Sequence, residues 1–204
     1  MRKTKLSRKT AETDITLSLN LDGSGKYKID TTIPFLDHML SLLSKHSYVD
    51  LEIKAKGDTD VDFHHLTEDL GIVFGEALKK SLGDKKGIAR YGNFLLPMDE
   101  ALSYVAIDLG GRPYLSYGVK FKRIIFVSAD GKRHRVVGFD YSLIEEFFRA
   151  VASSAGMNIH IKNRAGNNNH HIAESVFKGF AKALGQAVKI EKRKAGVPST
   201  KNTL

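Results

Sequence analysis

The chain of 204 residues contains no cysteine, which excludes disulfide bonds, thiolate metal sites and cysteine nucleophiles. It contains no run of 18 apolar residues, so we expect no membrane-spanning segment. The N-terminal stretch MRKTKLSRKTAETD is charged but is followed by no apolar segment, so we do not interpret it as a secretory signal. The chain also lacks low-complexity segments and Pro- or Ser-rich linkers. These absences favour a compact protein of a reducing cytoplasm.

The formal net charge is +9, from 32 Lys and Arg against 23 Asp and Glu. Such an excess suits phosphorylated small molecules, nucleic acid or anionic membranes, and it also occurs as an ordinary solvated surface. Basic residues gather in segment 120–135 and in the tail 189–201. Neither stretch interleaves aromatic residues as a base-stacking surface does. We therefore expect neither a nucleic acid nor a membrane as partner.

An internal repeat organises the chain. In the first half, DITLSLNLDG and YKIDTTI alternate like strands, PFLDHMLSLLSKHS has helical spacing, VDLEIKAKG alternates, and HHLTEDLGIVFGEALKKSLG is helical. The second half repeats this order with ALSYVAIDLGG, RPYLSYGVKF, SLIEEFFRAVASSAG, MNIHIKNRAG and HHIAESVFKGFAKALGQAVK. The prediction is an α+β fold of tandem duplicated strand-strand-helix-strand-helix units, with helices on one face of mixed or antiparallel sheets. The units either pack helix layer to helix layer or share one continuous sheet.

The repeat also predicts the organisation of the chain into one domain with two units. The first unit covers residues 1–88 and the second covers 89–204, so the units meet within roughly residues 85–97. A basic insert, residues 122–137, has no counterpart in the first half. Its ADGK turn signal predicts an extra hairpin or loop.

Two copies of the pattern His-His-x-x-Glu begin the last helix of each unit: His64, His65 and Glu68, then His170, His171 and Glu174. Residues three and four apart share a helix face, so each glutamate can chelate with either neighbouring histidine. Adjacent histidines point about 100° apart, so each motif suits two separate ions. Imidazole and carboxylate ligands favour Mn, Fe, Co or Zn. The duplication makes a metal centre the best interpretation.

Two further histidines fit this centre. His38 lies in FLDHML of the first predicted helix. His160 lies in NIHI, where it projects to the opposite face from Ile159 and Ile161. With them the nitrogen ligands number six, which allows three nitrogens and one glutamate for each of two ions.

Several basic and hydroxyl residues are candidates for phosphate binding. Arg112 follows two glycines in GGRP, where a guanidinium and exposed amides would form an anion site, and Arg90 in IARYG is similar. Lys178 lies two turns beyond the second histidine pair. Ser199 and Lys201 of the tail project to one side of an extended segment. On its residues alone, that tail is better interpreted as an ordinary, frayed chain terminus.

These motifs together closely resemble the imidazoleglycerol-phosphate dehydratase family of histidine biosynthesis. The matching stretches are SRKTAETDI, PFLDHML, GDTDVDFHHLTEDLGI, RYG, PMDEAL, DLGGRPYL, NIH, GNNNHHIAESVFKGFAKAL and PSTKNTL. They cover nearly the whole chain outside the basic insert. The resemblance implies a fold of the ribosomal protein S5 domain 2-like type. Departures are Phe63, Asn202 and the length of the insert, and none of them removes a ligand.

The resemblance implies two Mn²⁺ ions per active site and a 24-subunit homo-oligomer with active sites between subunits. The implied metal ligands are His38, His64, His65, Glu68, His160, His170, His171 and Glu174. The implied substrate contacts are Glu12, His38, His46, His64, Glu68, Arg90, Arg112, His170, Lys178, Ser199 and Lys201. Ser199 and Lys201 then become phosphate ligands of a small phosphorylated imidazole substrate.

The implied reaction removes water from imidazole glycerol phosphate and yields imidazole acetol phosphate. The hydrogen to be removed is not beside a carbonyl, so we expect the substrate ring, bound between two Mn²⁺ ions as imidazolate, to help expel the adjacent hydroxyl. A carboxylate must then accept the C–H proton. Because Glu68 and Glu174 serve the metal, Glu12 is the first candidate and Asp99 the second.

Three other functions remain open at this level. A nucleic-acid-binding α+β module would use the positive charge, a metallohydrolase would act on phosphate esters, and a metal-storage assembly would perform no chemistry. Release of inorganic phosphate would indicate the hydrolase, whereas a ketone that keeps its phosphate would indicate the dehydratase.

Overall fold

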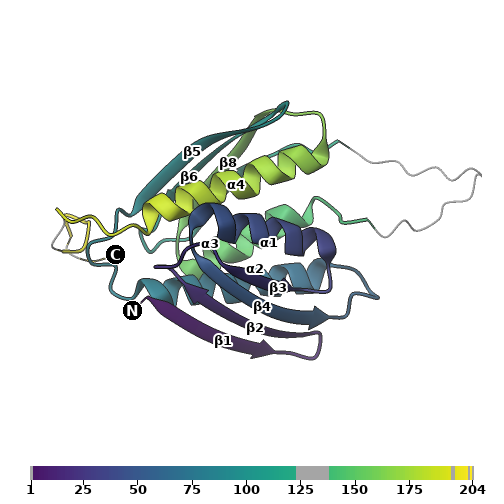
Figure 1. The fold of residues 1–204 in the computed structure, drawn as a ribbon, viewed down its shortest axis with the longest axis horizontal. Helices are drawn as coiled ribbons and strands as arrows, with labels where there is room; N and C mark the ends of the chain where they lie inside the picture. The colour runs from purple at the N-terminus through teal and green to yellow at the C-terminus, as the bar shows by residue number, and fades with distance from the viewer. Residues whose placement is uncertain (1, 123–137, 194–195, 202, 204) are drawn as a thin grey trace, which may run out of the picture.

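The computed structural model describes residues 2–122, 138–193, 196–201 and 203. Two four-stranded sheets enclose four helices, two on the inner face of each sheet (Figure 1). The first sheet, in the order β1-β2-β4-β3, contains β1 (Lys3–Lys9), β2 (Thr13–Asn20), β3 (Tyr27–Asp30) and β4 (Asp50–Gly57). The second, in the order β5-β6-β8-β7, contains β5 (Tyr91–Met98), β6 (Ala101–Asp108), β7 (Tyr114–Gly118) and β8 (Asn158–Ala165). The helices are α1 (Pro34–Ser47), α2 (His64–Leu82), α3 (Leu143–Ala155) and α4 (Asn169–Ala187).

The expected α+β fold with repeated units is confirmed. In each sheet three strands pair antiparallel and the fourth pairs parallel, β3 with β4 and β7 with β8. Of the two arrangements left open, the helix layers face each other, because α1 packs against α4 and α2 against α3. In the described part of the chain, no helix is long and apolar enough to cross a membrane.

Each unit begins with one strand that sequence analysis did not expect. β1 has the sequence KTKLSRK and lies at the edge of its sheet, where lysines and a single packed leucine replace the usual apolar alternation. β5 lies in the stretch that we interpreted as the joint between the units. Of the expected extra hairpin or loop at residues 122–137, all but residue 122 lies outside the described residues.

The core lies between the sheets and around the helices. Alternate residues of β2, Ile15, Leu17 and Leu19, are fully buried, as expected for a strand with one face toward helices. Close helix packing uses small residues: a Cβ at Gly71 of α2 would lie 2.6 Å from the Phe147 carbonyl oxygen of α3. Only glycine therefore allows this approach of the two backbones.

All four helices begin at the same end of the molecule (Figure 1). In the first sheet, α1 follows β3 and α2 follows β4, and those strands are parallel. Across the helix layer, His38 near the start of α1 contacts Glu174 near the start of α4, and Ser47 at the end of α1 lies against Gly185. The neighbouring helices therefore run in the same direction. We call this end the helix-start end.

Two hairpin turns reach the helix-start end as well. Thr13 at the start of β2 pairs with Gly57 at the end of β4, which places the β1–β2 turn there. Leu102 of β6 pairs with Ala165 at the end of β8, which places the β5–β6 turn there. The duplicated fold thus brings helix starts and carboxylate-bearing turns to one place.

Candidate metal centre and anion site

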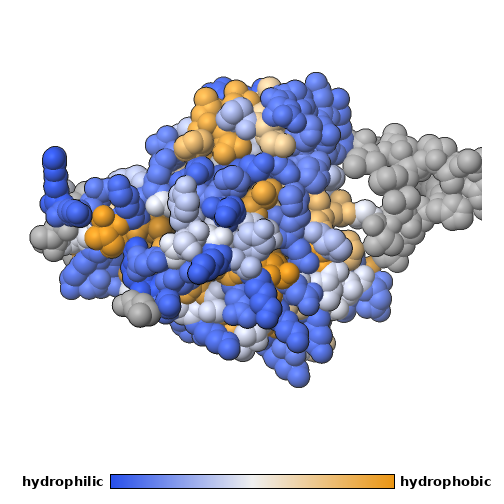
Figure 2. All heavy atoms as spheres, in the orientation of Figure 1, coloured by the Kyte–Doolittle hydropathy of each residue, from blue (hydrophilic) through white to orange (hydrophobic). Residues whose placement is uncertain are grey.

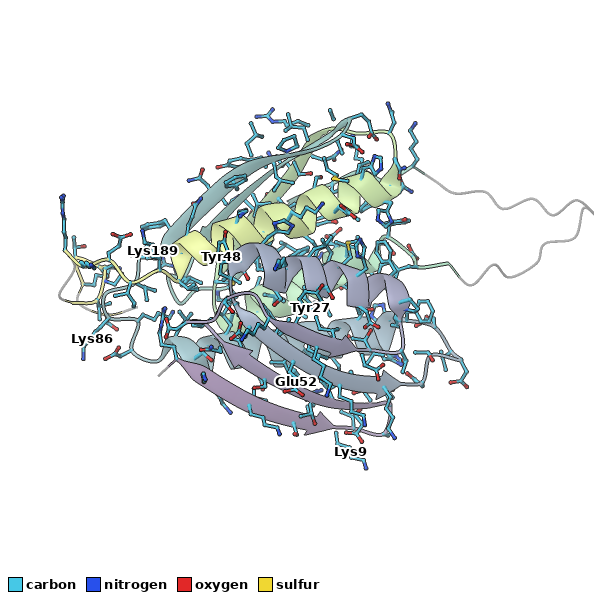
Figure 3. All side chains as sticks on the ribbon, viewed as in Figure 1. Lys9, Tyr27, Tyr48, Glu52, Lys86 and Lys189 are labelled. Carbon is cyan, nitrogen blue, oxygen red and sulfur yellow. The ribbon has the colours of Figure 1, made fainter. Side chains whose placement is uncertain are left out.

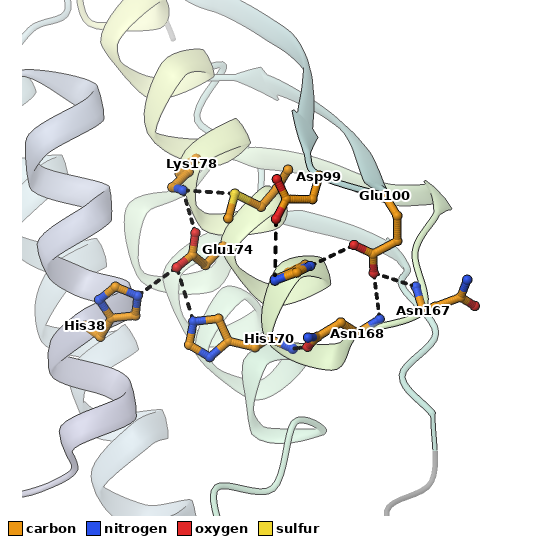
Figure 4. A network of polar contacts seen from close by, with 10 residues as sticks. His38, Asp99, Glu100, Asn167, Asn168, His170, Glu174 and Lys178 are labelled. Atoms are coloured by element: carbon orange, nitrogen blue, oxygen red, sulfur yellow. Dashed lines mark hydrogen bonds and ion pairs between the residues drawn. The ribbon is translucent and has the colours of Figure 1, made fainter.

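The first histidine cluster joins α1 to α4. His38 Nε2 and His170 Nε2 lie 2.8 and 3.1 Å from the same oxygen, Oε1 of Glu174 (Figure 4). Their ligand atoms all lie within 4.8 Å of one another. Glu174 is only 7% exposed, and its second oxygen accepts a hydrogen bond from Lys178. Burial alone would raise the pKa of Glu174, but Lys178, His38 and His170 outweigh it and hold the pKa at about 2. The carboxylate is therefore an anion.

The start of α4 explains this placement. The Asn168 side chain accepts a hydrogen bond from the His170 backbone N–H and so caps the helix. His170 and Glu174 are four residues apart on one face, and that face points toward His38 of the parallel helix α1. His46 lies in the last turn of α1, and burial, together with Lys182 and Lys178 of α4, lowers its pKa.

The second cluster lies at the start of α2. His65 Nδ1 is 3.0 Å from Asp58 Oδ2 and 3.9 Å from Glu12 Oε2. These three side chains also place their ligand atoms within 4.8 Å of one another. His64 Nε2 lies 3.7 Å from Glu68 Oε2 one turn further on. The hydrogen bond with Asp58 is the main cause that raises the pKa of His65.

The start of α4 repeats this arrangement. His171 Nδ1 lies 2.7 Å from Glu100 Oε2, and its Nε2 lies 3.7 Å from Asp99 Oδ2 (Figure 4). The backbone N–H groups of Asn167 and Asn168 donate to the other oxygen of Glu100. The His171 hydrogen bond, followed by those two, lowers the pKa of Glu100 to about 2. In both halves, the second histidine of the motif is therefore held through Nδ1 by a carboxylate.

Asp58 and Glu100 were missed in the sequence analysis. Each lies outside the His-His-x-x-Glu motif. Asp58 contacts its histidine from the turn after β4, and Glu100 contacts its histidine from the turn between β5 and β6. Glu100 follows Asp99 directly in PMDEAL, but the β5–β6 hairpin that aims it was not expected. A hydrogen bond to Nδ1 fixes the ring orientation and favours the tautomer with Nε2 available for a metal.

His160 lies apart from both clusters within one chain. Its neighbours Ile159 and Ile161 are fully buried, so the exposed His160 ring faces away from the helix layer, as the alternation predicted. Its ring lies 5.6 Å from that of Tyr114. The described residues place no second metal ligand of the expected set beside it.

A cavity of about 810 Å³ brings the expected phosphate ligands together. Its lining includes Arg90, Arg112, Ser199 and Lys201, and also Gly110 and Gly111. Lys178, which we also expected to bind phosphate, does not line this cavity, because it forms an ion pair with Glu174 in the first histidine cluster.

Arg90 is partly engaged in holding this cavity. Its Nε and Nη2 donate to Asp108 at 2.7 and 3.1 Å, and its Nη1 donates to the Pro198 carbonyl at 2.8 Å. The Asp108 hydrogen bond raises the pKa of Arg90. Arg90 therefore anchors the tail next to Ser199, in addition to any contact that it makes with an anion.

The two sites lie at opposite ends of α4. The Arg90 backbone N–H donates to the carbonyl of Ala187, the last residue of the helix, whereas His170 is in its first turn. Seventeen residues of helix span about 26 Å. One chain therefore offers nitrogen ligands at one end and the anion cavity at the other.

Comparison with known proteins assigns the chain to a family. The model of the imidazoleglycerol-phosphate dehydratase family matches residues 31–184. Dehydratases of this name from Endomicrobium trichonymphae and Lachnoclostridium phytofermentans are 56% and 55% identical, with 100% of this chain and 98% of each relative covered.

Solved structures agree with this result. The Staphylococcus aureus dehydratase superposes with a TM-score of 0.76 at 39% identity, covering 93% of this chain and 99% of the other. The Pyrococcus furiosus enzyme gives 0.77 at 37% identity, covering 98% and 100%. The chain belongs to the imidazoleglycerol-phosphate dehydratase family, the hydro-lyases of the dehydration step in histidine biosynthesis.

Proposed function

We propose that the chain dehydrates imidazole glycerol phosphate at a centre of two Mn²⁺ ions that binds the substrate ring as imidazolate. The observation that carries this proposal is the duplicated set of histidines at the helix-start end, each second histidine held by a carboxylate. Two imidazole nitrogens and the buried, anionic Glu174 oxygen already converge in the first cluster. Nitrogen and carboxylate donors fit a first-row divalent ion, although they do not single out manganese.

The residues that would hold the ions are those expected from sequence: His38, His64, His65, Glu68, His160, His170, His171 and Glu174. When bound, the ions supply Lewis acidity and a template that fixes the azole ring. Asp58 and Glu100 orient His65 and His171 from behind. Lys178 neutralises Glu174 when no cation is present.

Proton transfer requires a carboxylate that is free to exchange a proton. Glu12 is half exposed at the β1–β2 turn, and its oxygen lies 3.9 Å from His65 Nδ1. In our proposal Glu12 accepts the proton from the carbon next to the one that carries the departing hydroxyl. Loss of that proton and of the hydroxyl together makes water, and the remaining enol tautomerises to the ketone. Asp99, exposed beside His171, is the second candidate.

An oligomer with active sites between subunits completes the proposal. The covalent chain of the substrate lets its ring and its phosphate lie at most on the order of 10 Å apart. This distance is far less than the length of α4. One molecule therefore cannot span the histidines and the cavity of the same chain. A 24-subunit assembly would bring the two ends of different copies together.

The outer faces of the two sheets differ in character, and the difference favours assembly through the outer face of the second sheet. The first sheet carries charged side chains such as Lys9 and Glu52 on strands that face solvent (Figure 3). The second sheet exposes Leu95 and Tyr104, which are paired neighbours on β5 and β6. Figure 2 shows a group of hydrophobic residues over this sheet, at the top of the view. His160 shares that outer face with Tyr114. An exposed apolar patch is typical of a protein interface.

Product analysis tests the proposed reaction. Purified protein loaded with Mn²⁺ should convert imidazole glycerol phosphate to a ketone that retains its phosphate. Glu12→Gln should keep its metal content while turnover falls by roughly 10²–10⁴. Release of inorganic phosphate would overturn the dehydratase proposal, and wild-type turnover of the variant would move the proton transfer to Asp99.

Mixed oligomers test the shared sites. His170→Ala removes the metal half of a site and Arg112→Ala the anion half, so each variant alone should be inactive or impaired. If sites form between copies, random mixing should restore about a quarter of them. Absence of any recovery, in a mixture shown by mass spectrometry to contain hybrid oligomers, would contradict shared sites.

The cytoplasmic location stays a prediction.

A further inference from the structure

Lys85 is a buried lysine that belongs to neither histidine cluster and does not line the anion cavity. It lies in the turn after α2, is only 8% exposed and has a positive φ of 58°. Its Nζ donates to the carbonyl oxygen of Leu109 at 2.8 Å. Lysine is rarely buried, because removing an ammonium from water is unfavourable unless the group has a compensating partner.

The partner of Lys85 is a peptide group rather than a carboxylate. Within the described residues, Lys85 forms no ion pair, and both oxygens of the nearby Asp108 accept from Arg90. Burial and Lys79 lower the pKa of Lys85, Asp108 raises it, and Arg90 lowers it slightly. The fixed feature of its environment is therefore the hydrogen bond to Leu109, whose carbonyl Lys85 holds in one direction.

That direction determines where the next amide points. The Leu109 carbonyl and the Gly110 N–H belong to one planar peptide, and no described peptide bond is cis. In a trans peptide these two groups point in opposite directions. Because Lys85 holds the carbonyl on its own side, the Gly110 N–H faces away from Lys85.

Gly110 lines the anion cavity together with Gly111 and Arg112. A Cβ on Gly110 would lie 2.8 Å from Asp108 Oδ2 and 3.1 Å from Arg90 Nη2, so a side chain would crowd the salt bridge at the cavity wall. Backbone N–H groups next to a guanidinium form a concave anion site.

We propose that Lys85 is a positioning residue for the phosphate group of the substrate: it holds the Leu109–Gly110 peptide so that the Gly110 N–H faces a phosphate monoester in the cavity. Lys85 also puts a positive charge behind the cavity wall, where little water screens it. The inference rests on the proposed function only for the identity of the occupant.

The test compares Lys85→Met with the control Lys86→Met. Lys86 is the adjacent lysine, but it is exposed (Figure 3) and pairs with Asp84, so its replacement removes the same charge without touching Leu109. Binding is measured by calorimetry with inorganic phosphate, and KM and kcat with imidazole glycerol phosphate. Lys85→Met should raise the phosphate Kd and the KM about tenfold, with kcat and bound Mn²⁺ unchanged. Lys85→Arg, which keeps charge and donors, should recover part of the loss, and Lys86→Met should behave as wild type.

Equal phosphate Kd and KM in the two methionine variants would overturn the inference. If Lys85→Met does not fold, a crystal structure of the wild type with inorganic phosphate decides instead: Gly110 N should lie within hydrogen-bonding distance of a phosphate oxygen, and phosphate bound without this amide would overturn it. The two proposals fail separately. A wild type without dehydratase turnover, but with phosphate binding that depends on Lys85, would overturn only the proposed function.

Discussion

Replacing Glu100 should weaken metal binding although Glu100 itself is not an expected ligand. Glu100 accepts from His171 Nδ1 at 2.7 Å and from the backbone N–H groups of Asn167 and Asn168 at 3.0 and 2.8 Å. Three hydrogen bonds to one carboxylate fix both the imidazole ring and the loop that leads into α4. In Glu100→Ala the ring is free to rotate and to change tautomer, so Nε2 is no longer presented in one direction. Loss of such a supporting contact typically weakens metal affinity roughly 10–100-fold.

The measurement is a Mn²⁺ titration of the metal-free protein, followed by electron paramagnetic resonance of the free ion. Glu52→Ala, an exposed carboxylate on the outer face of the first sheet, is the control and should leave the affinity unchanged. Glu100→Gln, which retains an acceptor oxygen, should lie between wild type and Glu100→Ala. A correctly folded Glu100→Ala protein with wild-type Mn²⁺ affinity would refute the reasoning, because the orientation of His171 would then not depend on Glu100.

Three further outcomes follow from the structure. Phe148→Ala, which removes a fully buried ring, should lower the free energy of unfolding by about 3–5 kcal/mol in a denaturant titration. Gly71→Ala should also destabilise the fold, as a lowered melting temperature, because its Cβ meets the α3 backbone. Burial would raise the pKa of Asp50, but the Ser24 and Lys26 amides and the Asn20 side chain outweigh it and lower that pKa. Asp50 therefore stabilises the fold above the unfolded-state pKa of about 3.9, and the stability difference between wild type and Asp50→Asn should shrink as pH falls through the folded pKa.

The parts of the fold that sequence predicted are those with strong periodicity. Both His-His-x-x-Glu motifs begin helices, at His64 and Asn169, because the apolar positions of α2 and α4 recur at helical spacing over nineteen residues each. β1 was not predicted because it is an edge strand, with one row of unpaired backbone N–H and C=O groups and little apolar surface. In KTKLSRK only Leu6 is an apolar residue packed against the core. The facing of the two helix layers depends on contacts such as Gly71 against α3, which no local pattern encodes.

The candidate site was predictable in composition but not in arrangement. The type and spacing of its histidines indicated a metal centre, and the cavity gathers Arg90, Arg112 and the tail residues expected for phosphate. Sequence did not indicate that Arg90 would be engaged by Asp108, because the pairing joins residues eighteen positions apart across a strand turn. It also could not indicate Asp58 or Glu100, since each meets its histidine only in the folded structure.

The charge distribution along the helix layer gives a physical argument for the proposed contacts between unlike ends of two copies. Carboxylates gather at the helix-start end, where Glu12 and Asp58 stand beside one histidine pair and Glu100 beside the other. The cavity at the far end of α4 is lined by Arg112 and Lys201. Contact of the carboxylate turns of one copy with the cavity of another would pair opposite charges. Head-to-tail contacts generate rings and closed shells when their rotation closes. A chain that separates its nitrogen ligands from its anion cavity by the length of one helix is therefore suited to complete each site with a second copy.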